Sequence, residues 1–421
     1  MSDVVTAASA ATAASAPPQP VACCIVGGGP AGMMLGFLLA RAGVSVTVLE
    51  KHADFLRDFR GDTIHPSTLE VMHELGCLDA FLARPHTKAE QIDAQIGDTV
   101  VTMGDFRFLP THCKFIALMP QWDFLDFLAE EARRFPSFRL IMQAEAVDLL
   151  RAGDRVIGVK VRTPGGETTL AADLTVAADG RHSTLRDKAG MVVKNLGAPM
   201  DVLWFRLSRR PEDGGQTFGR VGDGTVFVNI DRGDYWQCAY VIAKGSVEVL
   251  RQKGIAAFRA TIARLVPRFV DRVGEIRDWD EVKLLTVAVD RLETWHRPGL
   301  LLIGDAAHAM SPIGGVGINL AVQDAVAAAN RLAGPLLRRA VAEADLAALQ
   351  RRRMWPTRAT QWMQIAIQNR VIRRILGGGA VRVPRVVRLM QRFPVLQRLP
   401  ARIVGIGFRP EHVRRGRAAR A

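Results

Sequence analysis

Three carboxylates of this sequence each stand directly after a short apolar segment, and the two aspartates among them are followed by small residues. Glu50 ends the segment 45–50, Asp179 follows the apolar residues of 173–178, and Asp305 follows 300–304. Open α/β sheets bind ligands beyond the carboxyl ends of their strands. The pattern therefore predicts that the three carboxylates share one ligand site, although either aspartate is also compatible with a plain helix cap.

A glycine cluster, VGGGPAG, precedes the first of these carboxylates. Gly27, Gly29 and Gly32 fill G-x-G-x-x-G, which serves a tight turn, close approach of the backbone to a pyrophosphate, and packing of helix on strand. Pro30 then begins a helix whose free N–H groups favour phosphate. The expected strand, helix and second strand cover residues 21–26, about 30–42 and 45–50. With Glu50 placed to accept a hydrogen bond from ribose, the segment predicts dinucleotide binding.

Two later segments repeat the order strand, carboxylate, loop and helix. They are DLTVAADGRHSTLR at 173–186 and LLLIGDAAHAMSPIGGVGINLAVQD at 300–324. Together with the glycine fingerprint, they resemble the FAD-dependent single-component aromatic hydroxylases, which include para-hydroxybenzoate hydroxylase and the ubiquinone-pathway hydroxylases. The resemblance spans about residues 21–340 and implies FAD as the cofactor, a choice that the glycines alone leave open.

The resemblance also assigns roles to single residues. It implies that Asp305 binds the ribitol chain, that Pro312 lies beside the isoalloxazine ring, and that the turn 315–319 presents backbone N–H groups to the flavin. A helix N-terminus there stabilises the anionic reduced flavin without a lysine. The candidate cofactor residues are Gly27, Gly29, Pro30, Ala31, Gly32, Glu50, Arg60, Gln121, Asp179, Gly180, Gly304, Asp305, Pro312, Gly315, Gly317, Ile318 and Asn319.

Four of the polar side chains have alternative interpretations. Arg60 also fits a surface ion pair with a neighbouring aspartate, and Gln121 an ordinary helix-start position. His308 is expected to be a packed residue rather than a base, and His65 a loop histidine. No catalytic residue is assigned, because the flavin carries the chemistry, and no metal site is expected.

Residues 196–284 alternate apolar and polar residues between turn signals, which predicts an antiparallel sheet with hairpins at Gly222–Gly224 and Arg232–Asp234. The resemblance implies that this sheet covers the flavin and forms most of the substrate pocket. Alternation places Val202, Trp204 and Arg206 on one face of the first strand. Candidate substrate contacts are Trp204, Arg206, Tyr235 and Tyr240, the last two being the only tyrosines of the chain. Trp204 in the core and Arg206 in solvent is the alternative.

The leading functional hypothesis is an FAD-dependent monooxygenase. NADH or NADPH reduces the flavin, O2 gives a flavin hydroperoxide, and an aromatic or quinone-like molecule is hydroxylated. No second G-x-G-x-x-G lies on a βαβ unit, so the nicotinamide is expected to bind transiently. The alternatives are a flavin-dependent reductase or dehydrogenase of an isoprenoid or quinone, and a non-catalytic, flavin-bound, membrane-associated protein.

The elements that position these residues define an α/β fold. We expect a Rossmann-like FAD-binding domain, an antiparallel-sheet substrate domain and a helical C-terminal tail. The expected division is a disordered lead-in over 1–20, a discontinuous FAD-binding domain over 21–195 and 285–340, a substrate domain over 196–284, and a basic helical region over 341–421.

Composition sets the class and the compartment. The chain has 421 residues, 48% of them hydrophobic and 23% charged, which excludes disordered, fibrous and integral membrane proteins. Five scattered cysteines argue against a disulfide framework or a zinc site. The first twenty residues lack the basic and apolar regions of a signal peptide, so a cytoplasmic protein is expected.

The net charge of +14 lies almost wholly in residues 362–421, which contain 14 arginines and one acid, Glu411. Arg385, Arg388 and Arg392 lie opposite Val386, Leu389, Met390 and Phe393 on one helix, as in helices at membrane interfaces. The sequence thus leaves open peripheral contact with the inner face of the membrane or docking of this region on the body. Nucleic acid is not an expected partner.

Overall fold

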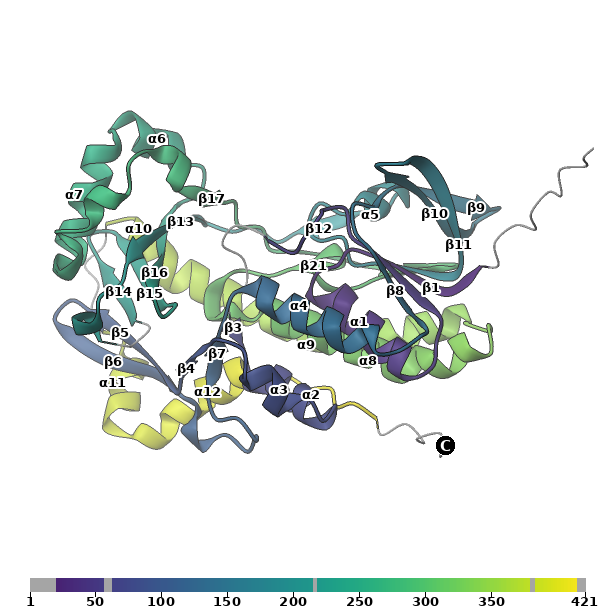
Figure 1. The fold of residues 1–421 in the computed structure, drawn as a ribbon. Helices are drawn as coiled ribbons and strands as arrows, with labels where there is room; N and C mark the ends of the chain where they lie inside the picture. Colours follow the sequence, from purple (N-terminus) through teal and green to yellow (C-terminus); the bar gives the residue numbers. More distant parts are fainter. Residues whose placement is uncertain (1–19, 57–62, 215–217, 379–382, 415–421) are drawn as a thin grey trace, which may run out of the picture.

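The structure, a computed structural model, describes residues 20–56, 63–214, 218–378 and 383–414. Figure 1 shows two sheets, each with its own helices, and a long helix, α9 (Glu343–Ile367), that extends from one part to the other. Arg60 is among the residues outside the described part of the chain.

The first sheet is mostly parallel, in the order β19-β20-β11-β1-β2-β8, with β10 and β9 added in antiparallel fashion to β11. Helices α1, α4 and α8 cover one face, and α5 lies on the other, so the central strands are buried and apolar on both sides. The elements are β1 (Val21–Val26), α1 (Pro30–Arg41), β2 (Val46–Leu49), α4 (Gln121–Arg133), β8 (Phe138–Ile141), β9 (Glu145–Ala152), β10 (Arg155–Thr163), β11 (Gly166–Ala177), α5 (Thr184–Lys188), β19 (His296–Arg297), β20 (Leu300–Leu302) and α8 (Gly317–Leu337).

The predicted strand, helix and strand of the glycine fingerprint are confirmed as β1, α1 and β2. Strand β1 lies next to β11, and β11 next to β20, all parallel, with Val26, Ala177 and Leu302 in register. The three predicted motifs follow these strands directly. They therefore meet at one edge of the sheet.

The second sheet has the order β17-β13-β16-β15-β14-β5-β6 and contains both predicted hairpins. Asp223, Gly224 and Gly233 have the positive φ angles of 49°, 70° and 88° that such turns need. Its strands are β5 (Gln91–Ile96), β6 (Thr99–Asp105), β13 (Met200–Ser208), β14 (Phe218–Gly222), β15 (Thr225–Asp231), β16 (Tyr235–Ala243) and β17 (Lys283–Leu285).

Two features of this sheet differ from the expectation. Strands β5 and β6 lie within residues 21–195, the range expected to bind FAD, and β14 pairs with β5 in parallel. Pairing between strands more than 120 residues apart leaves no local pattern, so hydrophobic periodicity does not reveal it.

The two faces of the second sheet have different neighbours. Helices α6 (Val247–Gln252) and α7 (Ile255–Leu265) pack on one face through Phe205, Phe227 and Phe258. On the other face, Val202 and Trp204 belong to a cluster that includes Ile313 of the third motif. The predicted alternation thus turns Trp204 toward the loop expected to hold the flavin.

Short elements connect the two parts. Two three-stranded sheets, β3-β7-β4 and β12-β18-β21, lie between them. The remaining short elements of the chain up to α8 are β3 (Thr63–Ile64), α2 (Pro66–Glu74), α3 (Leu78–Leu82), β4 (Thr87–Ala89), η1 (Phe106–Phe108), β7 (Ile116–Leu118), β12 (Val193–Asn195), η2 (Pro211–Asp213), η3 (Pro267–Phe269), η4 (Val273–Glu275), η5 (Trp279–Glu281), β18 (Asp290–Leu292), η6 (Gly304–Ala306), β21 (His308–Ala309) and η7 (Ile313–Gly315).

The basic C-terminal region docks on the body. Its elements after α9 are η8 (Gln368–Ile372), α10 (Arg373–Leu376), α11 (Arg385–Arg392), η9 (Pro394–Gln397) and α12 (Arg398–Gly405). Ala401 of α12 is buried in a cluster with Phe106 and Leu109. A boundary at residue 362 would cut α9 in two, so the charged segment is not a separate tail. In the described part of the chain, no helix is long and apolar enough to cross a membrane.

Candidate active site

The glycine turn after β1 has room only for glycine at two of its positions. A Cβ on Gly27, whose φ is +107°, would lie 2.3 Å from the Ala178 carbonyl oxygen. A Cβ on Gly32 would lie 1.9 Å from the Gly27 carbonyl oxygen. Gly29 differs, because nothing lies within 4 Å of its missing side chain. The turn thus leaves open space at the N-terminus of α1, which fits a pyrophosphate.

Glu50 is fixed at the end of β2. Its Oε2 accepts a hydrogen bond from the Gly28 N–H at 2.9 Å, and its Oε1 accepts one from the His52 N–H at 3.0 Å. Each carboxylate oxygen can accept a further bond. The position agrees with the predicted contact to a ribose, which remains a prediction.

Asp179 lies before α5, whose N-cap residue is Ser183. Its carboxylate accepts hydrogen bonds from the Ser183 hydroxyl at 2.5 Å and from the Leu185 N–H at 3.2 Å, at the start of α5. Burial raises the pKa of this carboxyl above its ordinary value. The side chain thus supports the start of α5, and the cofactor roles of Asp179 and of the adjacent Gly180, whose φ is +85°, remain predictions.

The third motif lies against the first. A Cβ on Gly304, whose φ is +59°, would come within 3.0 Å of the Ala31 Cβ at the start of α1. The Gly304 N–H donates to Asp324 Oδ2 at 3.1 Å. This contact presents Asp305, which is partly exposed, beside the glycine turn.

Asp324 is the centre of a buried charge network. The carboxylate is fully buried, accepts a hydrogen bond from Arg353 Nε at 2.8 Å, and lies 2.6 Å from His308 Nε2. Burial alone would raise the pKa of Asp324, but His308 and Arg353 hold it below its ordinary value. Arg353 also reaches Glu411 at 3.4 Å. His308 is thus a packed residue, and the network ties the third motif to α8, α9 and the C-terminal segment.

Three buried glutamines hold the loop before α8. Gln361 donates to the carbonyls of Asp290 and Ala309, at 2.6 and 3.2 Å. Gln364 donates to the Ser311 and Ile313 carbonyls, both at 2.9 Å, and Gln368 donates to the Ser311 hydroxyl at 2.7 Å. These bonds flank Pro312 on both sides. Sequence reasoning missed the glutamines, although the spacing i, i+3, i+7 on one helix face was a usable signal.

The same loop is held from the other side by β3 and α2. Asn319 Nδ2 donates to the Thr63 carbonyl at 3.1 Å, and its Oδ1 accepts from the Thr68 hydroxyl at 2.7 Å. A Cβ on Gly315, whose φ is +63°, would lie only 2.3 Å from Thr63 Oγ1. The Asn319 side chain therefore forms hydrogen bonds within the protein, and the predicted cofactor contact would be made by its backbone.

The N-terminus of α8 is open. No side chain caps it, and its first turn has no acidic residue. Nothing lies within 4 Å of the missing side chain of Gly317, and Ile318 follows. These observations fit the predicted binding of an anionic flavin edge. Gln121 is the first residue of α4 and follows β7, which pairs with β3.

The four substrate candidates lie on different faces of the second sheet. Trp204 faces the third-motif loop, and Arg206 lies over the Tyr235 ring at 4.7 Å. Tyr240 lies on the opposite face against Phe258, with ring centroids 5.4 Å apart. Burial raises the pKa of its hydroxyl. The geometry therefore argues against Tyr240 as a contact for a substrate on the flavin side.

Two buried donors on the loop-facing side have no hydrogen-bond partner among the described residues. They are Trp204 Nε1 and Gln237 Nε2. Gln237 pairs with Arg206 in register and is 2% exposed. Because unpaired buried donors are costly, they are candidates for contact with an acceptor on a bound molecule.

The fold and the site together define a dinucleotide-binding protein of the α/β class. The family described as "FAD binding domain" matches residues 20–363, and the chain belongs to this family. The predictions of FAD as cofactor and of an FAD-dependent oxidoreductase are confirmed.

Known relatives specify the chemistry further. The chain is 32% identical over 376 residues to 6-methylpretetramide 4-monooxygenase of Streptomyces rimosus, covering 89% of this chain and 90% of the relative. It is 28% identical over 315 residues to rifampicin monooxygenase of Streptomyces venezuelae, covering 70% and 60%. The predicted class of FAD-dependent monooxygenase is confirmed, and these relatives do not favour the two alternatives.

The fold is shared with solved structures. p-Nitrophenol 4-monooxygenase PnpA of Pseudomonas putida superposes with a TM-score of 0.71 at 20% identity, over 91% of this chain and 98% of that one. The predicted combination of a Rossmann-like part, a sheet part and a helical C-terminal region is confirmed by this likeness.

His65 gives a prediction for pH dependence. Its Nδ1–H donates to the Val404 carbonyl at 2.7 Å, and burial lowers its pKa from 6.5 to about 4. The His65 imidazole therefore binds a proton below about pH 6.5 in the unfolded chain, but only below about pH 4 in the native chain. This group should cost about 2 kcal/mol of stability between pH 8 and pH 5. Urea unfolding at both pH values, with His65→Gln as comparison, measures it. An equal loss in both proteins would contradict the prediction.

Gln364 gives a second prediction. Gln364→Leu removes three hydrogen bonds to the loop and leaves two carbonyls and the Ser311 N–H unpaired, so we expect a loss of stability of about 2–3 kcal/mol and weaker flavin binding. The exposed neighbour Trp362, replaced by leucine, is the matched control and should change neither. Flavin fluorescence and thermal unfolding are the measurements, and a stable Gln364→Leu with full flavin would refute the role.

Proposed function

We propose that this protein hydroxylates an aromatic or quinone-like small molecule with O2 and with electrons from NADH or NADPH. The observation that supports this best is the meeting of three motifs at one sheet edge, opposite the apolar face that contains Trp204. FAD, when bound, supplies the oxygen and electron chemistry. Because the Streptomyces rimosus relative is a 6-methylpretetramide 4-monooxygenase, 6-methylpretetramide is the first compound to test.

In this proposal the chain's own residues bind, orient and exclude water. Val202, Val241 and Ile313 line an apolar side that keeps water from the reacting atoms. Trp204 Nε1 and Gln237 Nε2 are the donors that would orient a carbonyl or phenolic oxygen of the substrate. The cofactor roles of Gly27, Glu50, Asp305 and the other candidate residues belong to the same proposal.

Product mass tests the function. Flavin-loaded protein, NADPH or NADH, and the test compound should give a product heavier by one oxygen, and 18O2 should label it. A change in hydrogen count without added oxygen would overturn the proposal in favour of a reductase. Trp204→Phe, which removes the N–H and keeps the ring, should raise KM about ten-fold while leaving flavin content unchanged.

We also propose that the C-terminal helices contact an anionic membrane at the inner face of the cell, which keeps the protein cytoplasmic. Val386, Leu389 and Phe393 are 63%, 48% and 49% exposed, and Val395 and Leu399 are 60% and 62% exposed. Isolated exposed apolar residues are ordinary, but a group of five on consecutive short helices is not. No acidic residue lies between 362 and 410, while the arginines of this segment complement acidic headgroups.

Vesicle flotation tests this contact. Replacing Leu389, Phe393 and Leu399 together by serine should abolish flotation with anionic vesicles, whereas neutral vesicles should bind neither protein. Val249→Ser with Val270→Ser, which are equally exposed on the α6–η3 side, is the matched control and should float as wild type does. Equal flotation of the triple variant would refute the proposal. Deleting residues after 361 is unsuitable, because it removes Gln364 and Gln368 from the loop.

A further inference from the structure

A cavity of about 500 Å³ lies on the α7 face of the second sheet, away from the face that meets Ile313. Strand register explains its position. Phe218 pairs with Asn229, and Arg220 pairs with Gln95, so these four side chains lie on one face at the end of the sheet beyond β16. The segment after α7 supplies the opposite wall. The lining residues are Gln95, Asp213, Gly214, Phe218, Arg220, Asn229, Val266, Pro267 and Arg268.

Several side chains that line the cavity carry hydrogen-bond donors, and two of these side chains have donors that lack an acceptor among the described residues. Asn229 is 1% exposed, and its Nδ2 has no partner in the described part of the chain. Arg220 has no ion pair or hydrogen bond to any described residue. Arg268 lies 4.9 Å from the Trp236 ring centroid and donates to the Asp213 carbonyl at 3.3 Å.

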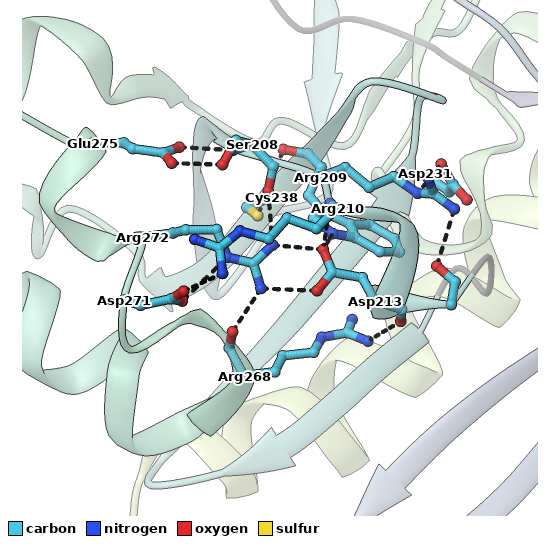
Figure 2. A network of polar contacts seen from close by, with 12 residues as sticks. Ser208, Arg209, Arg210, Asp213, Asp231, Cys238, Arg268, Asp271, Arg272 and Glu275 are labelled. Carbon is cyan, nitrogen blue, oxygen red and sulfur yellow. Dashed lines mark hydrogen bonds and ion pairs between the residues drawn. The ribbon is translucent and has the colours of Figure 1, made fainter.

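The carboxylate of Asp213, which belongs to this wall, is already paired with an arginine. Figure 2 shows the carboxylate of Asp213 facing Arg272, which donates to both of its oxygens at 2.5 and 2.8 Å. The Trp236 Nε1–H and the Arg210 N–H also donate to it, each at 2.9 Å. Arg272 holds the pKa of Asp213 well below its usual range. The charges of Arg220 and Arg268 are therefore left for a ligand.

We propose that this cavity is a second binding site, for a small flat molecule that carries a carboxylate. The guanidinium of Arg220 and the amide of Asn229 match a carboxylate, which accepts in one plane. Phe218, Val266 and Pro267 supply apolar walls for an attached ring. The site is independent of the proposed hydroxylation, because it lies on the other face of the sheet.

Fluorine NMR titration of the flavin-loaded protein with 4-fluorobenzoate tests the proposal. Arg220→Gln should weaken binding about ten-fold, since it removes a charge-assisted hydrogen bond. Asn229→Asp, which puts a negative charge in the cavity, should weaken it at least as much. Arg251→Gln, on the exposed surface of α6, is the matched control and should bind as wild type does.

Three results would overturn the proposal. Unchanged affinity in both Arg220→Gln and Asn229→Asp would show that the probe binds elsewhere. Weakening by Trp204→Phe with no effect of Arg220→Gln would place it on the flavin side. Equal affinity for uncharged 4-fluorobenzamide would show that the cavity does not select an anion. If Arg220→Gln fails to fold, Asn229→Asp and the benzamide comparison decide.

Discussion

Arg353→Met is expected to lower the free energy of unfolding by about 3–5 kcal/mol at pH 7. The guanidinium is 1% exposed and pairs with Asp324, which is 0% exposed. Methionine fills a similar volume but leaves the buried carboxylate without its arginine partner. A buried charge that loses its partner is far more costly than the pair was favourable. Urea unfolding of the flavin-loaded protein is the measurement.

Arg352→Met is the matched control for this experiment. Arg352 is the preceding residue, its side chain is 38% exposed, and it pairs with Glu411 rather than with Asp324. We expect a smaller loss of about 1–2 kcal/mol, because Arg352 is partly exposed and the buried Glu411 keeps Arg353 as a partner. Equal losses for the two variants would show that burial of the Asp324 network does not determine its contribution.

Asp305→Ala is expected to purify with less than about a tenth of the FAD that the wild-type protein retains. The expectation rests on the position of Asp305 beside Ala31 and the glycine turn, where loss of a charge-assisted hydrogen bond costs about ten-fold or more in affinity. Absorbance at 450 nm relative to protein, and fluorescence titration of the apoprotein, measure the loss.

The control for Asp305→Ala is Asp154→Ala, an exposed aspartate in the turn between β9 and β10. Both variants remove one carboxylate, so a general effect of charge would appear in both. A yellow Asp305→Ala protein with full FAD would show that the third motif has been misassigned.

The sequence predicts the local parts of this molecule well. The glycine turn, α1 and β2 follow from residues within 30 positions, and the hairpins of the second sheet follow from glycine next to aspartate. For Asp179 the sequence supports two interpretations, because a strand followed by aspartate is typical both of a ligand site and of a helix cap. The bonds to Ser183 and Leu185, which the sequence does not show, place its carboxylate at the start of α5.

Features that depend on pairing between strands far apart in the sequence cannot be predicted from local sequence patterns. Strand β5 joins β14 across more than 120 residues, and Tyr240 faces α7 because of a register that the sequence does not state. The glutamines at 361, 364 and 368 belong to a segment in which arginine is the most conspicuous residue type. The charge of that segment indicates only its exposed side. The buried glutamine side chains, which carry no charge, hold the loop beside Pro312.

The network that joins Gly304 to Asp324, Arg353 and Glu411 also constrains biosynthesis. Domains fold during translation as their residues emerge, and the glycine turn is complete early. Glu411, which contacts Arg353, and Val404, which accepts from His65, emerge hundreds of residues later. A ribosome that stops before them releases a chain whose third motif lacks its support. Cofactor insertion is therefore expected only after residue 411 has emerged, so that shorter chains do not become redox-active.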